Sequence, residues 1–150
     1  MHYLLFALFG FLFFSCEKQL SADQQLQADI AEIQKYLNDN NLTAQSTPSG
    51  LHYIITEPGT GGHPSISSSV TVNYTGKLLK NGDVFDQTNG SPRTFPLANL
   101  IAGWQEGIPL LKKGGRGTFF VPSALGYGPY GKGDIPANAP LIFDIELVNF

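Results

Sequence analysis

Few side chains in this 150-residue sequence have the types and spacing that bond-breaking chemistry requires. The histidines His2, His52 and His63 are widely separated, and no HExxH, CxxC or carboxylate cluster accompanies them. A zinc site usually draws three or four such ligands from short spacings. The G-x-S-x-G motif of a serine nucleophile is also missing. The sequence therefore predicts no metal, no cofactor and no covalent catalysis.

A glycine-rich stretch, Gly126 to Gly131, reads GYGPYG and matches the dinucleotide pattern G-x-G-x-x-G by letter. That pattern binds a pyrophosphate only where it follows a strand and opens a helix. Here Pro129 and further glycines are unsuited to a helix. We therefore expect a loop at this position, without a nucleotide.

Aromatic side chains are the chemical feature that remains. Large aromatics dominate ordinary hydrophobic cores, so a purely structural role is the simplest interpretation. The alternative is that some of them line a cavity that other molecules enter, and composition leaves both interpretations open. The residues concerned are Tyr74, Phe85, Phe95, Trp104, Phe119, Phe120, Tyr127, Tyr130 and Phe143.

The charge pattern argues against nucleic acid as a partner. The formal net charge is −3, and the chain has no basic run. Binding to phosphates needs a cluster of Lys and Arg. Lys112, Lys113 and Arg116 are close in sequence, but three charges near a turn are typical of a solvated surface.

The N-terminus has the pattern of an export signal. Tyr3 to Phe14 is a run of 12 uncharged residues, shorter than the roughly 20 that a membrane-spanning helix needs. Ser15 and Cys16 follow, and the string FFSC resembles the lipobox of bacterial lipoproteins. We expect a lipoprotein signal peptide at residues 1–15 and lipidation at Cys16. An ordinary signal peptide followed by an unmodified Cys is the alternative.

A lipid on Cys16 would attach the protein to a bacterial membrane. The expected location is the cell envelope on the periplasmic side, with the outer membrane favoured. Residues 16–48 are expected to form a tether and a short N-terminal helix, with polar residues 17–28 as the tether and Ser21 or Asp23 as the helix cap. Four apolar residues at spacings of 4, 3 and 4 define one face of that helix: Leu26, Ile30, Ile33 and Leu37.

The period of the apolar residues changes to two after Leu51, which indicates β-strands. Asn81-Gly82 is a strong hairpin signal. The helical candidate in this part is 97–107, and Pro109 predicts that it is short. We predict an α+β domain with an antiparallel sheet and one short helix against it. The expected strands are 51–56, 69–78, 84–88, 117–122 and 140–150.

Four motifs then occur in a recognisable order: VNYTGKLLKNGDVFDQT, FPLANLIAGWQEGIPLLKKGG, VPSALGYG and IPANAPLIFDIELV. Together they resemble the FKBP-type peptidyl-prolyl cis-trans isomerases over residues 49–150. The N-terminal segments look like those of FKBP lipoproteins from Bacteroidetes-type bacteria. The resemblance implies an antiparallel sheet wrapped around one short helix. It also implies an isomerase for X-Pro bonds of exported or envelope proteins, or alternatively a non-catalytic module that docks in an envelope complex.

The resemblance also implies a site in an apolar cavity between the helix and the sheet. The Ile101 N–H and the Tyr127 hydroxyl would bond substrate carbonyls, and Trp104 would form the floor. Asp86 would act either in catalysis or as a structural acceptor. The resemblance implies two classes of partner, proline-containing polypeptides and macrolide-type ligands. Arg93 stands where the family often has an aromatic residue, which bears on the macrolide ligands. The implied catalytic residues are Tyr74, Asp86, Tyr127 and Phe143, and the implied substrate-binding residues are Phe85, Phe95, Leu100, Ile101, Trp104 and Ile135.

Overall fold

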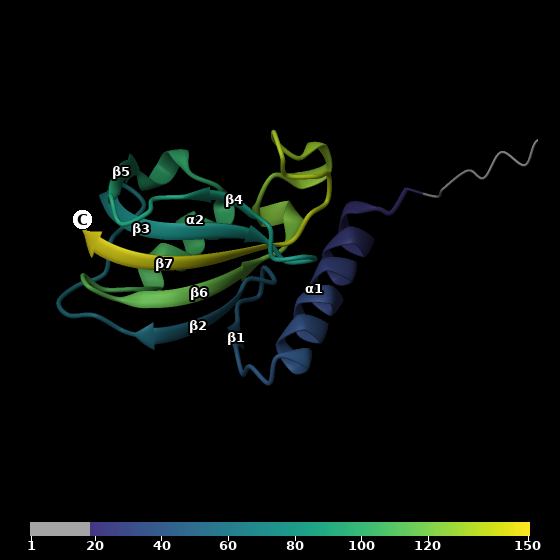
Figure 1. Cartoon of the computed structure of the whole chain (residues 1–150), viewed down its shortest axis with the longest axis horizontal. Coiled ribbons are helices and arrows are strands. Elements are labelled where there is room, and N and C mark those ends of the chain that lie inside the picture. The colour runs from purple at the N-terminus through teal and green to yellow at the C-terminus, as the bar shows by residue number, and fades with distance from the viewer. Residues whose placement is uncertain (1–18) are drawn as a thin grey trace, which may run out of the picture.

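The computed structural model describes residues 19–150 (Figure 1). The predicted signal peptide, residues 1–15, and the predicted lipidation site, Cys16, lie outside the described residues. The described part is an antiparallel sheet of seven strands with one short helix against it, which confirms the predicted α+β class. The strands are β1 (Gln45–Ser46), β2 (His52–Glu57), β3 (Ser69–Leu78), β4 (Val84–Gln87), β5 (Arg93–Pro96), β6 (Arg116–Val121) and β7 (Leu141–Asn149).

The two longest strands, β3 and β7, pair at the centre of the sheet. The strand order is β1-β2-β6-β7-β3-β4, and β5 pairs with β3 as well. Val70, Val72 and Tyr74 of β3 are buried on one face, as their alternation predicts. The chain turns from β3 into β4 through Asn81-Gly82, where Gly82 has a φ of 76° that favours glycine.

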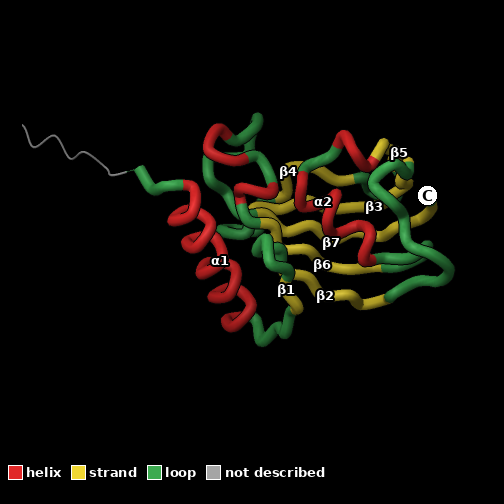
Figure 2. The backbone as a smooth tube through the Cα atoms, turned by 180° about the vertical axis from the view of Figure 1, so that it is seen from behind, coloured by secondary structure: helices red, strands yellow, loops and turns green. Residues whose placement is uncertain are grey.

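The short helix α2 (Ala102–Gly107) lies against one face of the sheet (Figure 2). It ends at Gly107 because Pro109 cannot continue an α-helix, and a 3-10 turn, Ile108–Leu110, takes up the proline. Two glycines allow the close approach of α2 to β6. An added Cβ at Gly103 would lie 2.6 Å from Val121 Cγ1, and one at Gly107 would lie 2.8 Å from Phe119 Cδ1.

The hydrophobic core has two parts. The main cluster fills the space between the sheet and α2, and includes Trp104, Phe119 and Phe143. A smaller cluster lies under the N-terminal helix α1 (Ala22–Asp39), where Ile33 and Leu37 pack with Leu79, Phe120 and Ile142. The helix therefore packs on its own domain. Among residues 19–150, no helix is both long and apolar enough to cross a membrane.

Three local predictions were wrong. The tether predicted at 17–28 overlaps the helix, which begins at Ala22; Ser21, one of the two predicted caps, is its N-cap and forms a capping box with Gln24. Gln45–Ser46, expected within the tether and helix segment 16–48, forms strand β1 and pairs with β2. Strand β5 was not predicted, since Arg93–Pro96 is mostly exposed and lacks apolar alternation.

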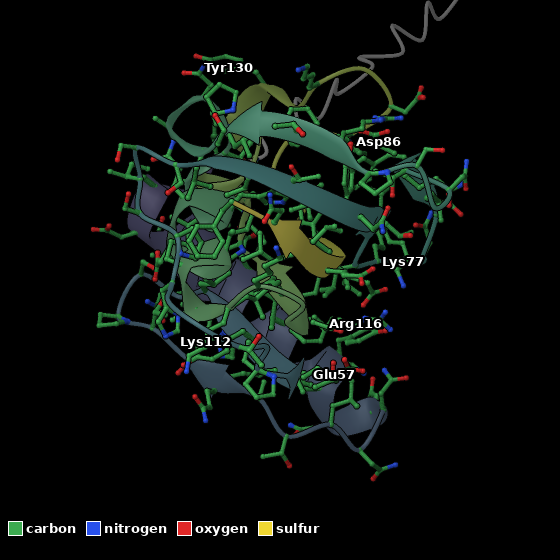
Figure 3. All side chains as sticks on the ribbon, turned by 90° about the vertical axis from the view of Figure 1, so that its left-hand side faces the viewer. Glu57, Lys77, Asp86, Lys112, Arg116 and Tyr130 are labelled. Atoms are coloured by element: carbon green, nitrogen blue, oxygen red, sulfur yellow. The ribbon has the colours of Figure 1, made fainter. Side chains whose placement is uncertain are left out.

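The outer face of the sheet, beyond the part under α1, is polar. Lys77 Nζ lies 2.7 Å from Asp144 Oδ2, and Arg116 donates to Glu146 at 3.1 Å. Figure 3 shows Lys77, Arg116 and Glu57, from three different strands, along one side of the sheet. Strands β3 and β7 thus carry aromatic and aliphatic groups on one face and ionic and hydroxyl groups on the other.

Candidate active site

An aromatic cage forms between α2 and the sheet, with the Trp104 indole at its centre. The Tyr74 ring meets Trp104 edge-on with centroids 4.9 Å apart, and Phe143 does so at 5.3 Å. Phe95 packs at 6.4 Å. Such edge-to-face pairs are favourable because a positive ring edge meets a negative ring face. We call Tyr74, Phe85, Phe95, Trp104 and Phe143 the aromatic cage.

Gly76 of β3 makes room for two of these rings. Phe85 of β4 and Phe143 of β7 meet edge-on above it, with centroids 5.6 Å apart. A Cβ added at Gly76 would lie 2.7 Å from Phe85 Cε2 and 2.8 Å from Phe143 Cε1. Gly76 pairs with Asp86 of β4 on one side and with Phe143 of β7 on the other. The missing side chain at this position is what lets three strands bring their aromatic groups together.

Polar groups join the cage on one side. The Tyr74 hydroxyl donates to Asp86 Oδ2. Arg93 Nη1 donates to the Tyr74 hydroxyl at 3.1 Å and to Asp86 Oδ1 at 3.3 Å. Arg93 Nη2 also donates to the Gln87 carbonyl at 3.1 Å. The arginine therefore ties β5 to β4 and forms an ion pair with the Asp86 carboxylate beside the cage.

Both tyrosines of the expected site hold their protons strongly. Burial, and then the hydrogen bond to Asp86, raise the pKa of Tyr74 to about 12. Burial, and then the negative charge of Asp86, raise the pKa of Tyr127 above its ordinary value. A phenol that is buried near a carboxylate resists ionisation, because its anion would lose water and meet a like charge. Both hydroxyls are thus O–H donors at neutral pH.

A cavity of about 290 Å³ opens beside the cage. Four of the expected site residues line it, namely Phe85, Asp86, Tyr127 and Ile135. Trp104, Phe143 and Tyr74 lie behind this lining and are 5%, 2% and 8% exposed. The loop that carries Tyr127 and Ile135 also supplies Lys132, whose ammonium lies 5.7 Å from the Tyr127 ring centroid.

The segment that enters α2 places the remaining expected residues, Leu100 and Ile101, against the main core cluster. Ile101 is the N-cap of α2, and its carbonyl accepts from Trp104 N at 2.9 Å. Within residues 19–150 the Ile101 N–H has no backbone partner, as expected for a group at the start of a helix. Nine of the ten expected site residues belong to the main core cluster or pack against it. The tenth, Asp86, accepts a hydrogen bond from Tyr74 of that cluster.

Two supporting residues were missed by sequence reasoning. Gln105 Nε2 donates to the carbonyls of Leu100 at 2.7 Å and Ala98 at 3.1 Å, which holds the segment before Ile101 in place. Thr88, 6% exposed, accepts the Tyr74 N–H on its hydroxyl at 3.0 Å. Neither belongs to the apolar pattern, and long-range side-chain bonds to the backbone leave no local signal in a sequence.

A larger hollow, about 540 Å³, lies on the outer face of the sheet. Hydroxyl, amide and ion-paired groups such as Thr75, Thr118 and Asp144 line it, so it offers little to an apolar ring. Among residues 19–150, no group of three or more His, Cys, Asp or Glu could hold a metal ion. His52 and His63 bond the carbonyls of Gly50 and Leu111 through Nδ1.

Comparisons with known proteins show which family the chain belongs to. The family model described as FKBP-type peptidyl-prolyl cis-trans isomerase matches residues 61–148. The chain is 45% identical over 141 residues to the probable FKBP-type peptidyl-prolyl cis-trans isomerase FkpA of Neisseria meningitidis, covering 88% of this chain and 52% of the relative. It is 46% identical over 105 residues to the outer membrane protein MIP of Legionella longbeachae, covering 68% of this chain and 45% of the relative.

A solved structure agrees with these sequence matches. The crystal structure of FkpA from Escherichia coli superposes with a TM-score of 0.72 at 34% identity, covering 85% of this chain and 63% of that one. The chain belongs to the FKBP-type peptidyl-prolyl cis-trans isomerase family. It spans about half the length of the curated relatives it matches.

Proposed function

We propose that this chain accelerates cis-trans rotation of X-Pro bonds in polypeptides of the cell envelope. The observation that carries the proposal is the aromatic cage around Trp104, which adjoins a cavity lined by Phe85, Asp86, Tyr127 and Ile135. Family membership supports it. Proline is the natural occupant, because its ring is apolar and its tertiary amide is the bond whose isomers interconvert slowly.

The proposed mechanism needs no nucleophile. Rotation about the peptide bond has a barrier of roughly 18–20 kcal/mol, because the twisted amide loses resonance, and it takes about 10–100 s without a catalyst. The planar amide is strongly dipolar and the twisted amide is less so. An amide that loses its water against the aromatic cage would therefore have its planar ground state disfavoured more than its transition state, and this difference would accelerate rotation.

Hydrogen bonds would orient the substrate in that cavity. The Ile101 N–H and the Tyr127 hydroxyl are proposed to bond carbonyls on either side of the rotating bond, while Phe85, Phe95, Leu100, Trp104 and Ile135 hold the proline ring and its neighbours. Tyr127 can donate throughout the neutral range, as an ordinary tyrosine can, and burial raises its pKa further.

The role of Asp86 is proposed to be mainly structural. Its two oxygens accept from Tyr74 and Arg93, which fixes the orientation of the Tyr74 ring against Trp104. Its carboxylate also lines the cavity and, after burial, is the second cause of the raised pKa of Tyr74 and of Tyr127. Tyr74 and Phe143 then complete the catalytic surface through their rings.

Proline-containing polypeptides are the proposed partners, with macrolide-type ligands as a second class. Arg93 affects the expected binding of macrolide-type ligands. It lies where the family often has an aromatic residue, and its guanidinium is 5.9 Å from the Tyr74 ring centroid. A charged group at this side favours a hydrated peptide over a large apolar macrocycle, so we expect weaker macrolide binding than in relatives with an aromatic residue there.

The test is an NMR exchange assay with a Leu-Pro peptide and the exported chain, residues 16–150. The proposal predicts exchange well above the uncatalysed rate, and Phe143→Ala should lower it. A rate that remains at background while the peptide still binds would refute the proposal and favour the alternative, a module that docks in an envelope complex.

The proposed location is the cell envelope, with a lipid on Cys16 and the outer membrane favoured. The signal-like sequence at residues 1–15 supports export, and one relative is named an outer membrane protein. Labelling with a radioactive fatty acid should modify the wild-type protein and spare Cys16→Ser. Label that persists in Cys16→Ser would refute the lipid anchor at this residue.

A further inference from the structure

A buried carboxylate in α1 takes no part in the mechanism above. Asp29 is 1% exposed. Its Oδ2 accepts from the Ser123 backbone N–H at 2.7 Å and from the Ser123 hydroxyl at 2.5 Å, and its Oδ1 accepts from Gln25 Nε2 at 2.7 Å. None of these donors is a cation. Burying a carboxylate costs several kcal/mol unless hydrogen bonds replace its water, and these three bonds do so.

The turn that Asp29 binds leads directly into the candidate site. Ser123–Leu125 is a 3-10 turn without a side-chain cap of its own. Asp29 supplies the missing acceptor for its first N–H from 94 positions away in the sequence. Gly126 and Tyr127 follow the turn at once. Figure 1 shows α1 beside the yellow-green segment that carries Tyr127.

The same turn touches α2 on its other side. A Cβ added at Gly103 of α2 would lie 3.3 Å from the Leu125 carbonyl oxygen. The turn is thus held between Asp29 of α1 and the glycine that precedes Trp104. Tyr127 follows this turn after one residue, so a shift of the turn would move Tyr127 relative to α2.

We propose that Asp29 is a positioning residue for the isomerase site, and that α1 is part of the frame of that site. By fixing the Ser123 turn, Asp29 would hold Tyr127 at the distance from α2 that a bound peptide requires. The inference rests on the proposed function. Small misplacements of groups that orient a substrate can cost about a hundredfold in rate, so an anchor outside the cavity can matter for catalysis.

The experiment compares Asp29→Ala and Asp29→Asn with two controls. Asp39→Asn changes an exposed carboxylate of the same helix that pairs with Lys35. Leu147→Ala empties a fully buried position of β7. Leu141, whose Cδ1 would lie 3.3 Å from a Cβ added at Gly126, is six residues away, or about 20 Å along the strand. Leu147→Ala therefore lowers stability without touching the turn. The measurements are kcat and KM for a Leu-Pro peptide and hydrogen exchange of the Leu125, Gly126 and Tyr127 amides.

Asp29→Ala is expected to lower kcat/KM about tenfold, mainly through kcat, and to speed exchange of those three amides relative to the amides of β7. Asp29→Asn should recover part of the rate, since its side-chain oxygen can still accept the Ser123 N–H. Asp39→Asn should match the wild type, and Leu147→Ala should keep its rate while it remains folded. If Asp29→Ala does not fold, Ser123→Ala removes only the hydroxyl bond and should show the same changes at smaller size.

A folded Asp29→Ala with wild-type kcat/KM would overturn the inference. So would an equal loss of rate in Leu147→Ala, because stability alone would then explain both. Wild-type protein without isomerase activity would instead overturn the proposed function. In that case hydrogen exchange alone decides whether Asp29 holds the turn. Unchanged protection of the three amides in Asp29→Ala would refute this structural role too.

Discussion

The two faces of strands β3 and β7 differ in what their side chains can do. On the inner face, Tyr74 and Phe143 meet Trp104 edge-on and are almost fully buried. On the outer face, residues next to them in sequence, Asn73 and Asp144, bond Glu146 and Lys77 at a partly exposed surface. One pair of strands thus supports both an apolar site and a solvated surface, and substitutions on the two faces should have different effects.

The largest effect is expected on the inner face from Trp104→Ala. Removing a buried Trp costs about 3–5 kcal/mol of unfolding free energy, and the floor of the cage disappears with it. The kcat/KM for a Leu-Pro peptide should fall about tenfold or more, which corresponds to about 1.4 kcal/mol of transition-state stabilisation. Chemical denaturation measures the loss of stability, and the NMR assay of X-Pro isomerisation measures the loss of kcat/KM.

Leu147→Ala is the matched control for Trp104→Ala. It is buried in the same core cluster but lies outside the aromatic cage. In Leu147→Ala the unfolding free energy should fall, while kcat/KM for the Leu-Pro peptide should stay close to the wild-type value. A Trp104→Ala protein that stays folded and keeps the wild-type rate would contradict the role of the indole as the floor of the site.

Gly76→Ala tests whether the close contact of Phe85 and Phe143 is needed. The added methyl would lie under 3 Å from both rings, so the rings must shift, and overpacking of this kind costs about 1–3 kcal/mol. We expect lower stability and a slower isomerase. Gly62→Ala is the control because nothing lies within 4 Å of its added Cβ. Equal behaviour of the two variants would show that the rings adapt freely.

A smaller effect should appear at high pH through Tyr74. Its folded pKa is about 12 against an ordinary value of 10.0, so the unfolded chain loses this proton first. The stability that protonated Tyr74 contributes is present below pH 10 and should decline as the pH rises from about 10 to about 12. Denaturation of Tyr74→Phe should therefore depend less on pH over that range than denaturation of the wild type. Equal slopes would contradict the burial of this hydroxyl beside Asp86.

The smallest effect is expected on the outer face from Lys77→Met. The ion pair between Lys77 and Asp144 is partly exposed to solvent, and such pairs contribute about 0–1 kcal/mol. Both the unfolding free energy and kcat/KM should stay close to the wild type. A large loss of rate in this variant would mean that the polar hollow takes part in the reaction, and the contrast between the faces would fail.

The parts that could be predicted are those with a local cause. The alternation around Tyr74 predicts β3 and its buried face, and Pro109 predicts the end of α2. The motif order predicts which residues gather around Trp104. Strand β5 lacks such a pattern, because Arg93–Pro96 is mostly exposed and its pairing depends on β3.

The supporting bonds of the site were beyond sequence reasoning for a related reason. Gln105 reaches back to the Leu100 carbonyl, and Asp29 meets Ser123 across 94 positions. Neither partner can be identified until the chain is folded. The motif comparison placed Arg93 where the family often has an aromatic residue. Its bonds to both Asp86 and Tyr74 became visible only in three dimensions.

The central claim is that proline enters beside the Trp104 cage on the inner face of the sheet. Nuclear Overhauser effects between a bound Leu-Pro peptide and the protein test it most directly. The Trp104 indole N–H is a useful probe because it is buried without a hydrogen-bond partner within residues 19–150. We predict contacts from the proline ring protons to the rings of Trp104 and Tyr127. Contacts to the methyl groups of Thr75 and Thr118 on the outer face instead would contradict the account.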